Sequence, residues 1–148
     1  MTNLVLTEFP LVSYDKLRYG DTDRQGHVNN AVFATFLETG RVELTRYRNN
    51  PLHDSNAEFV LVNLNLNLLG KIRWPGEVHI GTAITNIGSS SFKLYQQLFH
   101  NDTCVASAET VLVQINSETR KPQPLSDKSR AALEKFKITL LNQTHPSQ

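Results

Sequence analysis

The amino-acid sequence predicts an α+β fold in which a five-stranded antiparallel sheet wraps around one long central helix. One segment of about 18 residues carries apolar residues at helical spacing, and five other segments carry them at spacings typical of strands. The last four of these segments are joined by short turns, which place consecutive strands side by side and antiparallel. A sheet with one apolar face can bury that face against a single long helix.

The helix is expected to begin near residue 31, directly after a polar loop. Residues 11–19 alternate loosely between apolar and polar and predict the first strand, whereas residues 20–27 are polar and contain two glycines, which is typical of a loop. Asn29 or Asn30 can cap the helix that follows. The apolar stripe of this helix consists of Phe33, Phe36, Leu37, Gly40, Leu44 and Tyr47, and Asn49-Asn50-Pro51 ends it.

Residues 60–68 give the clearest strand pattern, because a row of Val and Leu residues alternates with a face made mostly of asparagine. The remaining strands are expected at 78–84, 92–100 and 103–115, separated by turns at 74–76, 88–91 and 101–102. Ser126 is expected to cap a short terminal helix that uses Leu133, Phe136 and Leu140.

Length and composition indicate one globular domain over residues 1–148, with an ordered core at about 10–137. The net charge of +1 gives no electrostatic reason to expect nucleic-acid or membrane binding. A single cysteine excludes an internal disulfide and a multi-cysteine metal site, and the five histidines show no ligand spacing, so no metal is expected. The N-terminal segment does not look like a signal peptide, which favours a cytoplasmic location.

An oligomer is expected because one helix cannot cover a five-stranded sheet and its edges. Strand 92–100 also carries apolar side chains on both faces, with Phe92, Leu94 and Leu98 on one and Tyr95 and Phe99 on the other. Since the long helix is committed to one face, we expect a second subunit to cover the other. A homodimer and a homotetramer are both compatible with this pattern.

The loop before the long helix is the richest stretch in chemistry. It carries Asp21, Asp23, Gln25 and His27 immediately ahead of the unpaired backbone amides of a helix start. A carboxylate placed there can act as nucleophile or general base while the amides hold a developing oxyanion. The alternative is that both aspartates only form turns and complement the helix dipole.

The segment Arg18-Tyr19-Gly20-Asp21-Thr22-Asp23-Arg24-Gln25-Gly26-His27-Val28-Asn29-Asn30 resembles the signature of hot-dog-fold acyl-CoA thioesterases of the 4-hydroxybenzoyl-CoA thioesterase type. Phe33, Phe36-Leu37-Glu38 and Arg41 are similar to that family's central helix. The resemblance implies a hot-dog fold and hydrolysis of an acyl-CoA or acyl carrier protein thioester without metal or organic cofactor. It also implies dimers that join their sheets edge to edge and share their active sites.

The resemblance also implies roles for individual residues. Asp23 matches the catalytic acidic residue, and the backbone amides of Asn29, Asn30, Ala31 and Val32 match the site of the thioester oxygen. Relatives of the acyl carrier protein branch have an Asp-x-Asn-x-His set, which here reads Asp23-x-Gln25-x-His27, so His27 is a second catalytic candidate and Gln25 a substrate-binding one. The Gly-Ser-Ser segment ending at Ser91 is similar to one that lies near the partner subunit's thioester site.

Three readings of the sequence therefore stay open: an acyl-CoA thioesterase, an acyl carrier protein thioesterase, and a non-catalytic acyl-binding or assembly subunit. Two charged pairs have mainly structural interpretations. Glu38 and Arg41 lie three residues apart on the helix and are expected to pair. Lys71 and Arg73 are expected to be surface charges, with coenzyme A phosphates as the alternative partner.

Overall fold

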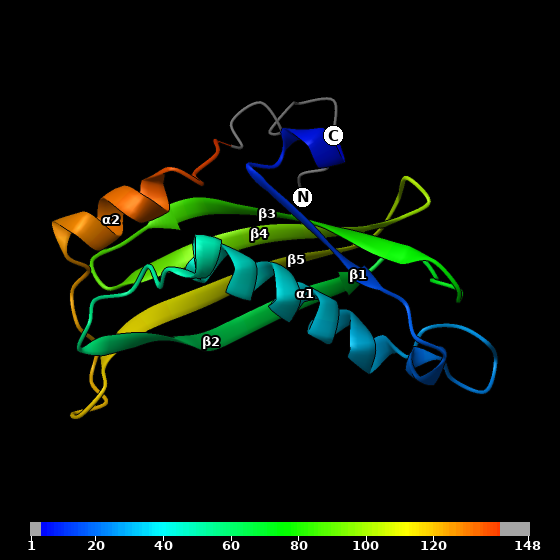
Figure 1. Ribbon diagram of the computed structural model, residues 1–148, viewed down its shortest axis with the longest axis horizontal. Coiled ribbons are helices and arrows are strands. Elements are labelled where there is room, and N and C mark those ends of the chain that lie inside the picture. Colours follow the sequence, from blue (N-terminus) through cyan, green and yellow to red (C-terminus); the bar gives the residue numbers. More distant parts are fainter. Residues whose placement is uncertain (1–3, 140–148) are drawn as a thin grey trace.

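The computed structural model describes residues 4–139 and has the predicted order of elements (Figure 1). Its strands and helices are β1 (Leu11–Lys16), α1 (Asn30–Thr45), β2 (Ala57–Leu68), β3 (Glu77–Ile87), β4 (Ser91–His100), β5 (Thr103–Asn116) and α2 (Asp127–Glu134). The strands form one antiparallel sheet in the order β1-β3-β4-β5-β2. The predicted α+β class with a sheet around a long helix is therefore confirmed. Leu140, which was expected in the terminal helix, lies outside the described residues.

Several element boundaries differ from the prediction. β2 begins at Ala57 rather than at residue 60, and β3 ends at Ile87 rather than at residue 84. β1 ends at Lys16, before the predicted end at residue 19, because Tyr19–Asp21 form a 3₁₀ turn. α1 ends at Thr45, and Tyr47–Asn49 form a separate 3₁₀ turn with Arg48 at a positive φ of 55°. The apolar stripe continues through Tyr47, so periodicity alone could not place the end of the helix.

α1 crosses one face of the sheet and packs most closely against β1, β3 and β4 (Figure 1). Its buried face includes Phe33, Phe36, Leu37 and Leu44. Gly40 lies at the closest approach, because a Cβ at this position would meet Thr82 Oγ1 at 2.6 Å and Gln96 Nε2 at 2.7 Å. The Gln96 amide also donates to the Leu37 carbonyl at 3.0 Å, so a side chain of the sheet is anchored directly to the helix.

Replacing Gly40 with alanine is expected to lower the free energy of unfolding by about 1–3 kcal/mol, since the added methyl group has no space and overpacks the helix against the sheet. Gly20→Ala is the matched control, because nothing lies within 4 Å of a Cβ built at Gly20. Urea denaturation of both variants measures the difference. Equal stability of the two variants would show that the close approach at Gly40 does not constrain the fold.

The second face of β4 is covered by the chain's own N-terminal segment, which corrects the expectation that a second subunit covers it. Leu4 and Phe9 are buried with Tyr95 and Phe99, and the Phe9 ring stacks on Tyr95 with 6.1 Å between ring centres. Gln97 fixes this segment, since it accepts from Leu4 N–H at 2.8 Å and donates to the Leu4 carbonyl at 2.9 Å. The double-sided pattern of β4 therefore gives no evidence for an oligomer.

In β2, unlike β4, most of the apolar face that the alternation predicts is exposed to water. Four large apolar residues of the strand and its end remain accessible: Leu61, Val62, Leu64 and Leu68. β2 is an edge strand bonded on one side only to β5, with a bulge between Leu61 and Asn63. An apolar edge strand left open to water favours pairing with another strand.

The chain's far end is closed by α2. Ser126 caps this helix as predicted, accepting a hydrogen bond from Ser129 N–H at 3.1 Å. Leu133 and Phe136 then join a core cluster that includes Leu44 of α1 and Ile84 of β3. α2 and the N-terminus of α1 consequently lie at opposite ends of the molecule (Figure 1).

Candidate active site

The loop between β1 and α1 is closed by its own backbone. Thr22 and Val28 pair as a short antiparallel bridge, and Asp23 N–H donates to the His27 carbonyl at 2.7 Å. Gly26 N–H donates to the Asp23 carbonyl at 3.1 Å, and Gly26 has a φ of +83°, a left-handed conformation that glycine adopts without strain. The tight turn 23–27 therefore places the Asp23 side chain at the tip of a defined loop.

One oxygen of Asp23 is fixed by this turn and the other is open. Oδ1 accepts hydrogen bonds from Gln25 N–H at 2.8 Å and from His27 N–H at 3.2 Å, while Oδ2 has no hydrogen-bond partner within residues 4–139. The bond from Gln25 N–H is the main cause of a lowered pKa of the Asp23 carboxyl. Desolvation is the next largest effect and opposes it, while His27 and Lys71 add to the lowering. An oriented, exposed and ionised carboxylate results.

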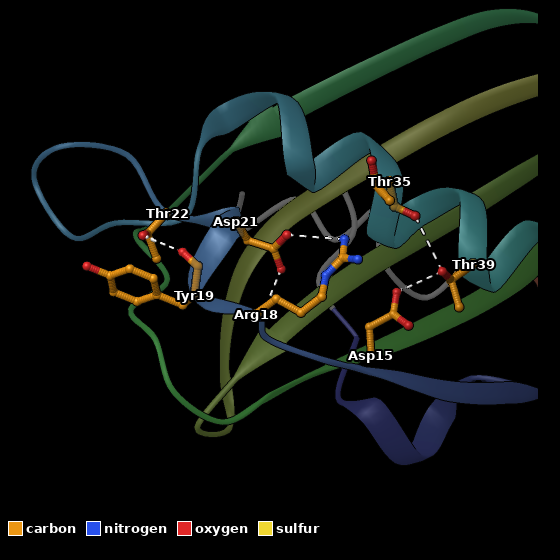
Figure 2. Close-up of polar contacts among 7 residues, drawn as sticks. All are labelled: Asp15, Arg18, Tyr19, Asp21, Thr22, Thr35 and Thr39. Carbon is orange, nitrogen blue, oxygen red and sulfur yellow. Dashed lines mark hydrogen bonds and ion pairs between the residues drawn. The ribbon is translucent and has the colours of Figure 1, made fainter.

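Asp21 differs from Asp23 because it is buried and fully used in shaping the loop. Its Oδ2 accepts from Arg18 N–H at 2.9 Å, and its Oδ1 from Arg18 Nη2 at 3.3 Å (Figure 2). Its backbone carbonyl accepts from Asn29 N–H at 2.8 Å, which joins the loop to the helix start. Close by, Thr39 of α1 donates to Asp15 of β1 at 2.7 Å. Asp21 therefore has the turn-forming role that Asp residues commonly take.

The start of α1 is capped by Asn29, as the sequence allowed. Its Oδ1 accepts from Ala31 N–H at 2.9 Å, and its carbonyl accepts from Val32 N–H at 2.9 Å. Asn29 N–H in turn donates to the Asp21 carbonyl. Of the four amides from Asn29 to Val32, that of Asn30 therefore has no hydrogen-bond partner in the described chain. Of the four amides expected at the thioester oxygen, Asn30 is thus the one that a ligand can reach without displacing a bond.

His27 and Gln25 occupy different environments. His27 is half-buried and pairs with Arg73 across a short antiparallel bridge, and its Nδ1 is shielded from water without a hydrogen-bond partner in the described chain. Gln25 is exposed, and its contact with Asp23 is made by its backbone N–H. The geometry therefore brings Asp23, Gln25, His27 and the Asn30 amide to one end of α1.

Ser91 lies at the other end of the sheet. Ser91 begins β4, next to the turn that follows the last residue of β3. The chain that leads into the Asp23 loop lies at the first residue of β3, where Leu17 N–H donates to the Gly76 carbonyl. Ten residue steps along β3 span roughly 30 Å, so Ser91 and the Asp23 loop of one chain do not share a site. Glu38 also lies away from the Asp23 loop, because it is exposed on α1 two turns beyond the start of the helix.

Sequence reasoning missed an exposed aromatic pair beside the loop. The rings of Tyr19 and Trp74 meet edge to face with 5.5 Å between their centres, and Tyr19 is 75% and Trp74 46% exposed. Lys71 and Arg73 precede Trp74, and Lys71 is close enough for its charge to lower the pKa of Asp23. Tyr19 and Trp74 lie far apart in the sequence, so no local pattern could have paired them.

Within residues 4–139, no group of three or more histidine, cysteine or acidic side chains could hold a metal ion. No described helix combines the length and apolar character needed to cross a membrane.

Comparison with known proteins places this loop and helix in a defined family. The profile of the thioesterase-like superfamily matches residues 17–133. The acyl-CoA thioester hydrolase YbgC of Escherichia coli O6:H1 is 26% identical over 127 residues, covering 83% of this chain and 92% of its own length.

Solved structures agree with this match. A predicted thioesterase from Bacillus stearothermophilus superposes with a TM-score of 0.78 at 23% identity, covering 86% of this chain and 96% of its own. A thioesterase from Thermus thermophilus, solved in complex with coenzyme A and Zn, has a TM-score of 0.73 at 26% identity, with 86% and 95% covered. The chain therefore belongs to the thioesterase-like superfamily and is a thioesterase with the hot-dog fold.

Proposed function

We propose that this protein hydrolyses an acyl-CoA thioester to a free carboxylic acid and coenzyme A, with Asp23 as the catalytic carboxylate. The observation that carries the proposal is the state of Asp23: Oδ1 is held by two backbone amides while Oδ2 is open and the carboxyl is exposed. Acyl-CoA is the substrate named for the similar YbgC protein, and coenzyme A is bound in the similar Thermus structure.

In the general-base form of the mechanism, Asp23 Oδ2 takes a proton from water as that water attacks the thioester carbonyl carbon. The carbonyl oxygen gains negative charge, and the Asn30 N–H at the start of α1 stabilises it together with the helix dipole. The carbon–sulfur bond then breaks, and the coenzyme A thiolate leaves and takes up a proton. In the nucleophilic form, Oδ2 attacks the carbonyl carbon and expels the coenzyme A thiolate, which takes up a proton. Water then hydrolyses the resulting mixed anhydride to the free acid and the Asp23 carboxylate.

Supporting roles are proposed for the other residues of the loop. The half-buried His27 can position the water or exchange a proton, because its Nδ1 has no partner in the described chain. Gln25, Asn29, Ala31 and Val32 shape the substrate side of the loop and helix start. Ser91 can join such a site only from a second copy of the chain, which fits the homodimer or homotetramer that we propose.

A panel of acyl-CoA esters tests the function directly. Release of coenzyme A thiol is measured with wild-type protein and with Asp23→Asn as the inactive control. Turnover of at least one ester that depends on Asp23 is expected. If acyl carrier protein thioesters alone are hydrolysed, the enzyme belongs to the alternative branch, and if no thioester is hydrolysed while acyl-CoA binds, the chain is a non-catalytic acyl-binding subunit.

Treatment with EDTA is expected to leave thioester hydrolysis unchanged, because the proposed reaction uses a carboxylate, water and backbone amides only. Hydrolysis rates are compared before and after dialysis against the chelator, with the dialysed protein also assayed after addition of Zn²⁺ or Mg²⁺. A loss of activity that a divalent metal restores would contradict the proposed mechanism.

The acid limb of the pH profile of kcat/KM is expected below about pH 4, since the pKa of Asp23 is lowered from the ordinary value of aspartate. Asp23 must be ionised to act, so activity is lost as the pH falls through its lowered pKa and is retained above it. The profile is measured between pH 3 and pH 8, in the range where the protein stays folded. An acid limb above about pH 5 would indicate that another group controls the reaction.

A further inference from the structure

The second half of α1 carries a buried arginine that has no ion-pair partner among residues 4–139. Arg41 is only 9% exposed, and its Nη1 is buried with no hydrogen-bond partner in the described chain. The pairing with Glu38 expected from the sequence does not form, because none of the ion pairs within 4 Å in residues 4–139 involves Arg41. A guanidinium in this state lacks the anion that would compensate its loss of water.

Burial also has an electrostatic consequence at this position. It lowers the pKa of the Arg41 guanidinium, and the charge of the exposed Glu38 acts in the opposite direction. Arginine nevertheless stays protonated in proteins and donates in a planar fork that matches a carboxylate. The Arg41 charge therefore has no anionic partner among the described residues, and a carboxylate from outside the chain could supply one.

Arg41 lines a groove of about 280 Å³ between α1 and the edge strand β2. One wall of the groove is apolar and consists of Val42 from α1, Phe59 and Leu61 from β2, and Leu112 from β5. The groove exists because α1 packs mainly on β1, β3 and β4, which leaves β2 incompletely covered. An apolar wall beside an unpaired guanidinium suits an amphipathic molecule with one acidic end.

The other charges around the groove favour an anion. Glu58 lines it, but both of its carboxylate oxygens accept from Arg120 Nη1, at 3.0 and 3.1 Å. Arg46 also lines the groove, as does the exposed Glu38. His53 Nδ1 lies 2.8 Å from the Asp54 carbonyl, so this nitrogen is hydrogen-bonded to the backbone. Once Glu58 is paired with Arg120, two arginines and one unpaired carboxylate line the groove, so its net charge is positive.

We propose that this groove binds a carboxylate carried on an apolar chain, with Arg41 as its anion partner. Two sources share this chemistry: an acidic group at the far end of the acyl chain of a thioester substrate, and a free carboxylic acid of the kind the reaction releases. The first source rests on the proposed function. It is compatible with position, because Arg41 lies eleven residues beyond Asn30, roughly 16 Å along the same helix.

Calorimetric titration of the whole protein with sodium hexanoate tests the binding site. Wild-type protein is expected to bind hexanoate, and Arg41→Met to bind it at least tenfold more weakly. The alcohol 1-hexanol has the same chain without the charge and is expected to bind at least tenfold more weakly than hexanoate. Arg48→Met is the matched control, since it removes an exposed arginine that does not line the groove and should leave the affinity unchanged.

Equal hexanoate affinity of wild-type protein and Arg41→Met, or no binding by wild-type protein, would overturn the proposal. Val42→Trp keeps the proposal testable if Arg41→Met does not fold, because Val42 is exposed at the groove and a bulky side chain there blocks the groove without altering Arg41. Loss of hexanoate binding in this variant supports the site, and unchanged binding contradicts it.

Hydrolysis of the longer esters sebacoyl-CoA and decanoyl-CoA separates the two sources. If the carboxylate belongs to the substrate, the ratio of kcat/KM for sebacoyl-CoA to that for decanoyl-CoA falls at least tenfold in Arg41→Met and is unchanged in Arg48→Met. If it belongs to the free acid, Arg41→Met instead loses inhibition by added hexanoate. Absence of any hydrolysis by wild-type protein would refute the proposed function but leave the hexanoate titration as an independent test of the groove.

Discussion

Asp23→Asn is expected to lower kcat for acyl-CoA hydrolysis at least about 100-fold, which is the range that loss of a positioned acid–base group produces. The substitution removes the negative charge and the basic oxygen but keeps an oxygen that can accept from Gln25 and His27 N–H. The turn 23–27 is therefore preserved, and the melting temperature should stay within a few degrees of the wild-type value. Steady-state kinetics and thermal unfolding of the pure variant measure the two effects.

Asp21→Asn is the matched control, since it makes the same chemical change two residues away. Asp21 is buried and both of its oxygens accept from Arg18, so we expect a loss of stability of about 1–3 kcal/mol and a much smaller change in kcat. If Asp21→Asn reduces kcat more than Asp23→Asn does, the two aspartates have been assigned in the wrong order. Near-native turnover of Asp23→Asn would refute the catalytic assignment altogether.

The order and type of the elements could be predicted because each depends on local spacing. The stripe from Phe33 to Leu44 has helical period, and the strands that become β3 to β5 are separated by short turns that allow one antiparallel arrangement. The cap of α2 at Ser126 was likewise local, since one side chain and the next turn of backbone define it.

Long-range packing could not be read from the same patterns. The alternation in β2 predicts a strand with one buried face, yet Val62, Leu64 and Leu68 of that face are exposed because α1 lies over other strands. The two-sided β4 predicts a covering partner, and the chain itself supplies one through Leu4 and Phe9. In both strands the pattern indicates that a face is apolar but does not say which segment covers it.

The candidate site shows the same division. The Asp-x-Asp loop ahead of a helix is visible in the sequence, but spacing does not show that Asp21 is buried against Arg18 while Asp23 is exposed at a turn. Neither does it show that Asn29 uses the Ala31 and Val32 amides and leaves that of Asn30 open. The spacing of Glu38 and Arg41 predicts an ion pair on the helix. It cannot show that Arg41 lies instead in a groove beside β2 with an unpaired Nη1.

The double substitution Val62→Lys and Leu64→Lys is expected to convert an active oligomer into an inactive monomer of 16.7 kDa. β2 is a long apolar edge strand, and its Val62 is 56% exposed. Two copies can pair these edges antiparallel about a twofold axis, which satisfies their open backbone groups and buries the exposed leucines. Lysines on the edge oppose that pairing through like charge and the loss of apolar contact.

Activity should fall with dissociation, by at least about 100-fold, if part of each site comes from a second copy, as the distance between Ser91 and the Asp23 loop suggests. Sedimentation equilibrium gives the mass, circular dichroism verifies the fold, and thiol release gives the rate. Val12→Lys on the opposite edge strand β1, 45% exposed, should leave mass and rate unchanged. A fully active wild-type monomer at micromolar concentration would contradict the shared site. If Val12→Lys alone gave the monomer, the subunits would associate through β1 and not through β2.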